Sequence, residues 1–82
     1  MTLPASLPRY AYYQGPQPVG EVFTLRRDSL TMTCTLATHR LGWELRLTAG
    51  RNVVRTQICT FEAEVFSVSQ SWEDEAKRQG WG

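Results

Sequence analysis

Histidine and cysteine are scarce in this chain of 82 residues, which has one histidine, His39, and two cysteines, Cys34 and Cys59. A metal centre needs several such donors close together, and these three fall in a predicted turn and on two strands that are not neighbours. Glycine-rich loops that bind phosphate groups are also lacking, since Gly42 and Gly50 are isolated. The sequence therefore predicts no metal, no cofactor and no catalytic centre, and we expect the protein not to be an enzyme.

Long apolar runs are missing as well. No stretch approaches the roughly 20 residues that a membrane-spanning helix needs, and Pro4 and Pro8 interrupt the few apolar residues at the start. We therefore expect no secretory leader and no membrane partner, but a cytoplasmic protein with reduced thiols. The net charge of +1 gives no overall field that would attract nucleic acid or an anionic membrane.

The length is enough for one domain and too short for two. Residues 1–20 contain all the prolines and tyrosines of the chain without a period of 2 or 3.6 residues, which predicts an extended N-terminal arm rich in both. Two interpretations of the arm stay open. It is a loose tail, or Tyr10, Tyr12 and Tyr13 pack against a neighbouring subunit or the flank of the domain. Residues 21–82 then form a single ββββα domain.

Strict alternation of apolar and polar residues predicts four strands, at Glu21–Arg27, Leu30–Leu36, Leu41–Thr48 and Asn52–Cys59. The short connections between them indicate hairpins, so the sheet is an antiparallel meander. One face of this sheet is expected to be apolar and buried. Its predicted members are Phe23, Leu25, Leu30, Met32, Cys34, Leu36, Leu41, Trp43, Leu45, Leu47, Val54 and Ile58.

The three turns also predict which residues face each other. Closing the first turn around Arg27 and Asp28 sets Leu25 opposite Leu30. Closing the second over residues 37–40 sets Cys34 opposite Trp43, and the third turn sets Leu47 opposite Val54 and Trp43 opposite Ile58. All three hairpins agree on one apolar face, and this agreement is the strongest internal support for the fold.

After Cys59 the apolar period lengthens to that of a helix, predicted to run from Phe61 to Gln79 with Thr60 as its N-cap. Gly80 is placed to end the helix in a left-handed conformation, with Trp81 folding back on the last turn. The apolar stripe should cover the sheet, and it consists of Phe61, Val65, Val68 and Trp72. The predicted fold class is α+β: a four-stranded antiparallel β-meander with one C-terminal amphipathic helix packed on one face.

The other face of the sheet is left uncovered and is rich in threonine, which by itself indicates only good strand propensity. The predicted register sets Arg46 directly opposite Arg55, and like charges in such a position destabilise a sheet unless something offsets them. Two sources of a compensating negative charge stay open: Glu44 within the chain, or an acidic group of another molecule. The candidate binding surface consists of Arg46, Arg55, Thr31 and Thr33, together with Tyr10, Tyr12 and Tyr13.

We expect no disulfide between the two cysteines, because a full strand lies between the strand of Cys34 and the strand of Cys59. Cys34 should point into the core as a small buried hydrophobe. Cys59 lies at the junction of strand and helix, where we expect partial exposure, but no neighbouring base is visible that would activate its thiol.

The segments Gly42–Leu47, Gln57–Cys59, Glu64–Phe66, Trp72 and Gly80–Trp81 resemble those of a group of small uncharacterised bacterial proteins with a Trp-Glu-Leu-Arg-Leu strand and a terminal Gly-Trp. That resemblance implies a fold and a bacterial setting, and no activity. The predicted topology also resembles the repeat unit of single-strand-binding proteins of the Whirly and Pur-alpha type. Those proteins stack bases on exposed aromatic residues of the sheet, and the exposed face predicted here has none.

Two hypotheses of function follow. The first is a non-enzymatic binding or accessory protein that acts as a homodimer, because so small a core is marginal alone and association would stabilise it. Its contacts would come from the threonine-rich face, an edge strand or the tyrosine arm, with itself or with an unidentified protein. The alternative is binding of single-stranded nucleic acid through the exposed sheet face.

Overall fold

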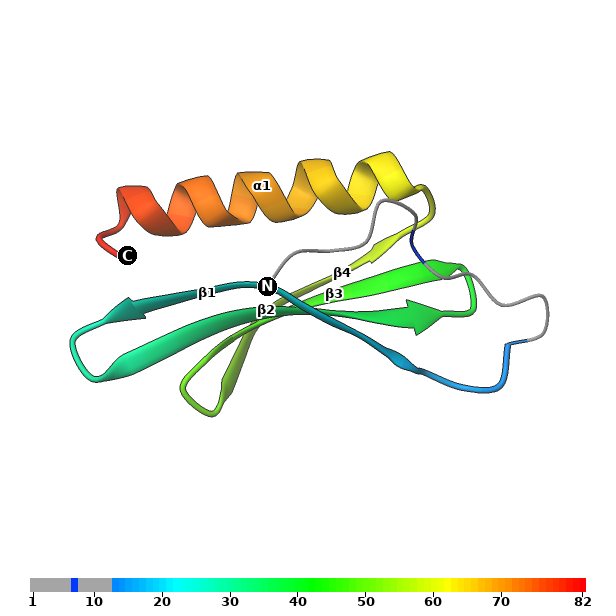
Figure 1. The fold of residues 1–82 in the computed structure, drawn as a ribbon, viewed down its shortest axis with the longest axis horizontal. Coiled ribbons are helices and arrows are strands. Elements are labelled where there is room, and N and C mark those ends of the chain that lie inside the picture. Colours follow the sequence, from blue (N-terminus) through cyan, green and yellow to red (C-terminus); the bar gives the residue numbers. More distant parts are fainter. Residues whose placement is uncertain (1–6, 8–12) are drawn as a thin grey trace.

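The computed structural model of the protein describes residue 7 and residues 13–82, which fold into two layers, a sheet and a helix (Figure 1). The elements follow in the order β1 (Pro18–Arg27), β2 (Leu30–His39), β3 (Gly42–Ala49), β4 (Asn52–Cys59) and α1 (Glu62–Arg78). The strands form an antiparallel sheet of order β1-β2-β3-β4, and α1 lies on one face of it only (Figure 1). The predicted fold class is confirmed. Within the described part of the chain, no helix is both long and apolar enough to cross a membrane.

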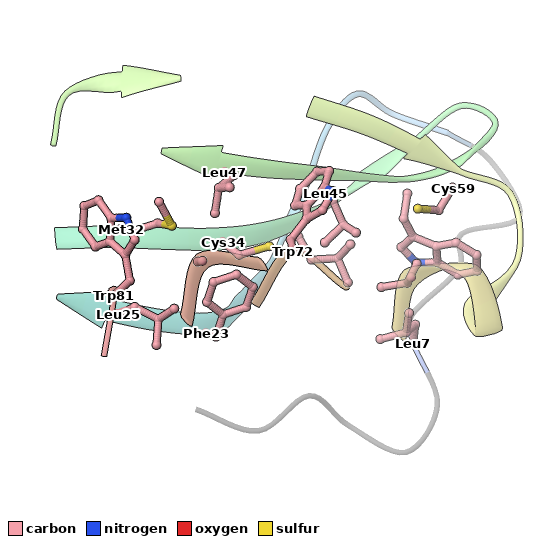
Figure 2. Packing of buried hydrophobic residues seen from close by; sticks show 14 residues of the cluster. Leu7, Phe23, Leu25, Met32, Cys34, Leu45, Leu47, Cys59, Trp72 and Trp81 are labelled. Carbon is pink, nitrogen blue, oxygen red and sulfur yellow. The ribbon is translucent and has the colours of Figure 1, made fainter. Parts of the chain in front are cut away.

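The core lies between α1 and one face of the sheet, as the alternation predicts. Met32 and Leu45 are buried on the sheet side, and Val65 and Trp72 are buried on the helix side. Figure 2 shows Trp81 beside Met32 at one end of the cluster, while Leu7 and Cys59 lie at the other end. The buried apolar residues are Leu7, Phe23, Leu25, Met32, Cys34, Leu36, Trp43, Leu45, Leu47, Cys59, Val65, Trp72, Ala76 and Trp81.

The first hairpin turns one residue later than predicted, and the second has a shorter turn than predicted, so the predicted partners are wrong although the faces are right. Leu25 pairs with Met32 instead of Leu30, and Cys34 pairs with Leu47 instead of Trp43. Both shifts are by an even number of residues, and side chains alternate with a period of two, so each strand keeps its core-facing set. Leu30 and Leu41 are exceptions, because they lie at a strand end and in a turn and are exposed.

The third hairpin differs from the prediction by one residue, which inverts most of β4. Leu47 pairs with Arg55 and Thr48 pairs with Val53, so Val54 is an extra residue that forms a β-bulge. Beyond the bulge the register places Trp43 opposite Cys59, where the sequence predicts Ile58. Because a shift of one residue exchanges the faces, Arg55 and Cys59 lie on the helix side.

The helix begins one residue later than predicted, with Phe61 instead of Thr60 as its N-cap and with no side-chain capping bond. The backbone N–H of Thr60 donates to Oε1 of Glu64 at 2.9 Å. Phe61 therefore lies at the helix end, outside the apolar stripe, and is 71% exposed. The prediction that it covers the sheet is wrong, whereas Val65 and Trp72 do cover it.

The C-terminal end of the helix follows the prediction closely. Gly80 has a φ of 96°, and the N–H of Trp81 donates to the carbonyl of Ala76 at 3.1 Å. These are the features of a Schellman motif. The chain then reaches the edge of β1, where Gly82 and Arg26 exchange two backbone hydrogen bonds of 2.7 and 2.8 Å. The side chain of Trp81 is buried, and the guanidinium carbon of Arg27 lies 4.7 Å from its ring centroid.

At the N-terminal side, β1 begins at Pro18, three residues before the predicted strand. Leu7, a residue of the predicted arm, is buried in the core of the domain. Its N–H donates a hydrogen bond of 2.6 Å to Oε1 of Glu62. Tyr13 is 39% exposed. The predictions for Tyr10 and Tyr12 lie outside the described residues.

Candidate binding surface

The face of the sheet that α1 does not cover, called the open face below, is built from rows of paired residues. In one row Thr33 pairs with Thr24 on β1 and with Thr48 on β3, and Thr48 in turn pairs with Val53. In the next row Thr35 pairs with Arg46. The threonine side chains are short, so their hydroxyl groups and the backbone beneath them lie close to the surface. The open face consists of Glu21, Thr24, Arg26, Thr31, Thr33, Thr35, Ala37, Glu44, Arg46, Thr48, Val53, Thr56 and Ile58.

Arg46 is the central charged side chain of the open face, as the sequence predicts for this residue. Its Nη2 lies 3.2 Å from Oε1 of Glu44, and the two charges largely compensate each other. Both residues line an open hollow of about 290 Å³, whose other walls are Pro16, Pro18, Thr35 and Ala37. The arrangement provides a cation, a carboxylate and a hydroxyl side by side on the open face. Such a set suits polar contacts with another molecule.

Arg55 is not part of this surface, and its predicted pairing with Arg46 is wrong. Arg46 pairs with Thr56, while Arg55 lies on the other side of the sheet opposite Leu47. There Nη1 of Arg55 lies 2.9 Å from Oε2 of Glu75 on α1, and its guanidinium carbon lies 5.8 Å from the ring centroid of Trp72. The contact that the sequence suggests for another molecule is thus supplied by the helix of the same chain.

Tyr13 lies away from the open face, in a hollow of about 220 Å³ that it shares with His39, Arg40 and Leu41. Nδ1 of His39 accepts a hydrogen bond of 3.1 Å from the N–H of Leu41. Cys59 is not among the lining residues, so this hollow does not bring the histidine and a thiol together. The described residues contain no group of three or more His, Cys, Asp or Glu side chains that could hold a metal ion.

Both cysteines are free and buried. Cys59 is 0% exposed, so the expectation of partial exposure is wrong, and the odd shift of β4 is the reason. Burial raises the pKa of the Cys34 thiol from its usual 9.0 to about 12, and the carboxylate of Glu73 adds to this effect. Burial and the carboxylate of Glu64 raise the pKa of Cys59 as well. These are thiols that resist ionisation and are poor nucleophiles in the folded protein.

The raised pKa of Cys34 predicts a loss of stability at alkaline pH. Well below pH 9.0 the thiol is protonated in the folded and the unfolded chain, so it does not affect the stability. Above this pH the unfolded chain releases a proton that the folded chain retains until about pH 12, so rising pH favours unfolding. We expect the urea midpoint to fall between pH 8 and pH 10.5, and to fall less in a Cys34→Ala variant measured over the same range. An equal fall in both proteins would contradict the assignment.

Two features of the structure carry no clear signal in the sequence. The bulge at Val54 is one, although the two adjacent valines at residues 53 and 54 already interrupt the alternation. The pairing of Gly82 with Arg26 is the other. The terminal Gly-Trp predicts how the helix ends, but it does not show that the following residue pairs with β1.

In comparisons with protein-family models, curated proteins and solved structures, none matched this chain.

Proposed function

We propose that the protein is a non-enzymatic binding or accessory protein that acts as a homodimer. The observation that carries this proposal is the unequal covering of the sheet. One face bears the apolar core beneath α1 (Figure 1), while the open face bears threonine hydroxyls, one ion pair and, among its large apolar side chains, Val53 and Ile58. An exposed face of this kind forms polar contacts with a partner without the cost of covering a large apolar patch.

The proposal of a homodimer is supported by exposed apolar side chains elsewhere on the domain. Leu41, Val54 and Phe61 are each more than half exposed. A domain of this size gains stability by association. Light scattering at micromolar concentration tests this part of the proposal. A mass of about twice the 9.4 kDa of the single chain is expected, and a mass of one chain would contradict it.

The role of the open face is tested by substituting two of its central residues, Thr33 and Arg46. In a Thr33→Arg, Arg46→Glu variant the row of hydroxyls is interrupted at its centre and the cation of Arg46 is lost, while neither residue contributes to the core. Proteins captured by the wild type from a lysate of the host should be lost by this variant and kept by an Arg78→Glu control. Capture that survives the exchange contradicts the assignment of the open face. We place the site of action in the cytoplasm, and the two free thiols support this location.

A second candidate function is the binding of single-stranded nucleic acid by the open face. Arg26 and Arg46 both project from it among the threonine hydroxyls, and these groups suit the sugar-phosphate backbone. A titration of labelled oligonucleotide at low and moderate salt tests this candidate, since phosphate contacts weaken steeply as salt rises. Absence of binding at low salt rules it out, and Arg46→Glu should abolish any binding that is found.

A further inference from the structure

We propose that two copies of the protein pair about a two-fold axis at the end of the sheet where α1 begins, with the Phe61 ring of each copy inserted in a hollow beside Leu41 of the other. This inference rests on the homodimer proposed above and names its interface. At this end of the molecule the turn between β2 and β3 lies next to the junction of β4 and α1 (Figure 1).

Leu41 and Phe61 are neighbours at this end of the sheet. The register of β3 with β4 continues beyond its last pair, because a Cβ at Gly42 would lie only 3.1 Å from the Cα of Thr60. The next two residues in this register are Leu41 and Phe61. Their exposed fractions, 60% and 71%, are the highest among the large apolar side chains of the described residues. The two most exposed apolar residues therefore form one patch.

Neither residue of this patch suits its own position in the fold. Phe61 is the N-cap of α1, where small polar residues are preferred, and it makes no side-chain capping bond. Leu41 is the second residue of the two-residue turn between His39 and Gly42, where Gly and Asn are the usual choice. An exposed apolar residue that serves neither the core nor its local structure is expected where another molecule covers it.

The patch provides both an inserting side chain and a hollow to receive it. Leu41 lines a hollow of about 220 Å³, whose other walls are Tyr13, His39 and Arg40. A cavity of about 150 Å³ accepts benzene, so this hollow has room for the ring of Phe61. A two-fold axis makes every contact twice. An axis that runs between Leu41 and Phe61 therefore inserts both rings at once.

The charges beside the patch are complementary in the same arrangement. Arg40 is exposed and forms no ion pair within the described residues. The carboxylate of Glu64 lies next to Phe61, because its Oε1 accepts a hydrogen bond of 2.9 Å from the N–H of Thr60. When Phe61 enters the hollow of the second copy, Glu64 approaches the Arg40 that lines that hollow. The two ion pairs formed in this way set the orientation of the dimer.

An exchange of charges tests this contact. Arg40→Glu and Glu64→Lys each bring like charges together in their own homodimer, so each should raise the dimer dissociation constant at least about 10-fold at low salt. A mixture of the two variants restores opposite charges at both contacts, so a heterodimer should form with close to wild-type affinity. The matched control is Arg51→Glu, in the turn between β3 and β4 at the other end of the sheet. It should leave the dissociation constant unchanged.

Phe61→Ser separates the interface from the fold. Serine is a preferred N-cap residue, so the helix is retained, whereas the dimer loses both inserted rings and its dissociation constant should rise at least about 100-fold. Leu30→Ser, at the opposite end of the sheet, removes another exposed apolar side chain and should have no such effect. Unfolding of the single chain, measured below the dissociation constant, should change little in either variant. Circular dichroism establishes that every variant is folded.

Two results would overturn this interface and leave the homodimer standing. One is a wild-type dimer that Phe61→Ser leaves intact. The other is a mixture of Arg40→Glu and Glu64→Lys that associates no better than each variant alone. A wild type that is monomeric up to about 100 μM overturns both the interface and the homodimer.

Discussion

Replacing Gly42 by alanine is expected to lower the free energy of unfolding by about 3–4 kcal/mol, among the larger effects of a single substitution in a small domain. Gly42 has a φ of 146°, a conformation that other residues rarely adopt, and a Cβ at this position would collide with the backbone carbonyl oxygen of Cys59. The obstacle is backbone of the neighbouring strand, so it cannot rotate away as a side chain would. Urea unfolding measures the effect.

Gly15→Ala is the matched control for Gly42. Gly15 also has a positive φ, 102°, but a Cβ there would meet no atom within 4 Å. Its substitution therefore carries the backbone strain without the collision, and should cost on the order of 1 kcal/mol. Equal costs at the two positions would show that the close approach of Gly42 to Cys59 does not contribute to stability.

Trp81→Ala is expected to cost about 3–5 kcal/mol, as is usual when a buried tryptophan is removed. The ring fills the end of the core beside Met32 and Leu25 (Figure 2), and the guanidinium of Arg27 covers it from outside. Loss of the ring also loosens the following residue from β1. Thermal and urea unfolding both report the change.

Phe61→Ala is the informative comparison for Trp81. Both residues are large and aromatic, and the sequence predicts Phe61 to be part of the core, but its side chain is 71% exposed. Its removal should change the free energy of unfolding by no more than about 0.5 kcal/mol. A cost similar to that of Trp81→Ala would contradict the position of Phe61 outside the core.

The faces of β1, β2 and β3 could be predicted from the sequence because their errors in register are even. A hairpin that closes two or four residues away from the predicted pairing still directs Met32, Cys34 and Leu45 toward the helix. The period of two that identifies a strand also protects the assignment of its faces. Burial of these residues therefore did not require the correct turn.

The face of β4 could not be predicted, because the extra residue in the bulge shifts the rest of the strand by one position and so exchanges its two faces. With Val53 and Val54 adjacent, either register places a valine at the start of the strand, and the sequence does not distinguish them. The register is decided by tertiary contacts between β4 and the helix. Arg55 can lie on the helix side because its guanidinium forms an ion pair with Glu75 and a cation–π contact with Trp72 there. This contact removes Arg55 from the candidate binding surface and leaves Arg46, Thr31 and Thr33 on the open face.

The two hydrogen bonds between Arg26 and Gly82 join the first strand to the last residue of the sequence. Because they join residues far apart in the sequence, we expect them to form after the helix has packed and Trp81 has entered the core, so that the outer side of β1 is completed late in folding. Fraying of the last few residues would in turn expose the amide of Arg26 to exchange with solvent. The two ends of the domain are therefore expected to open together as one cooperative unit, although the whole sheet separates them in the order of the chain.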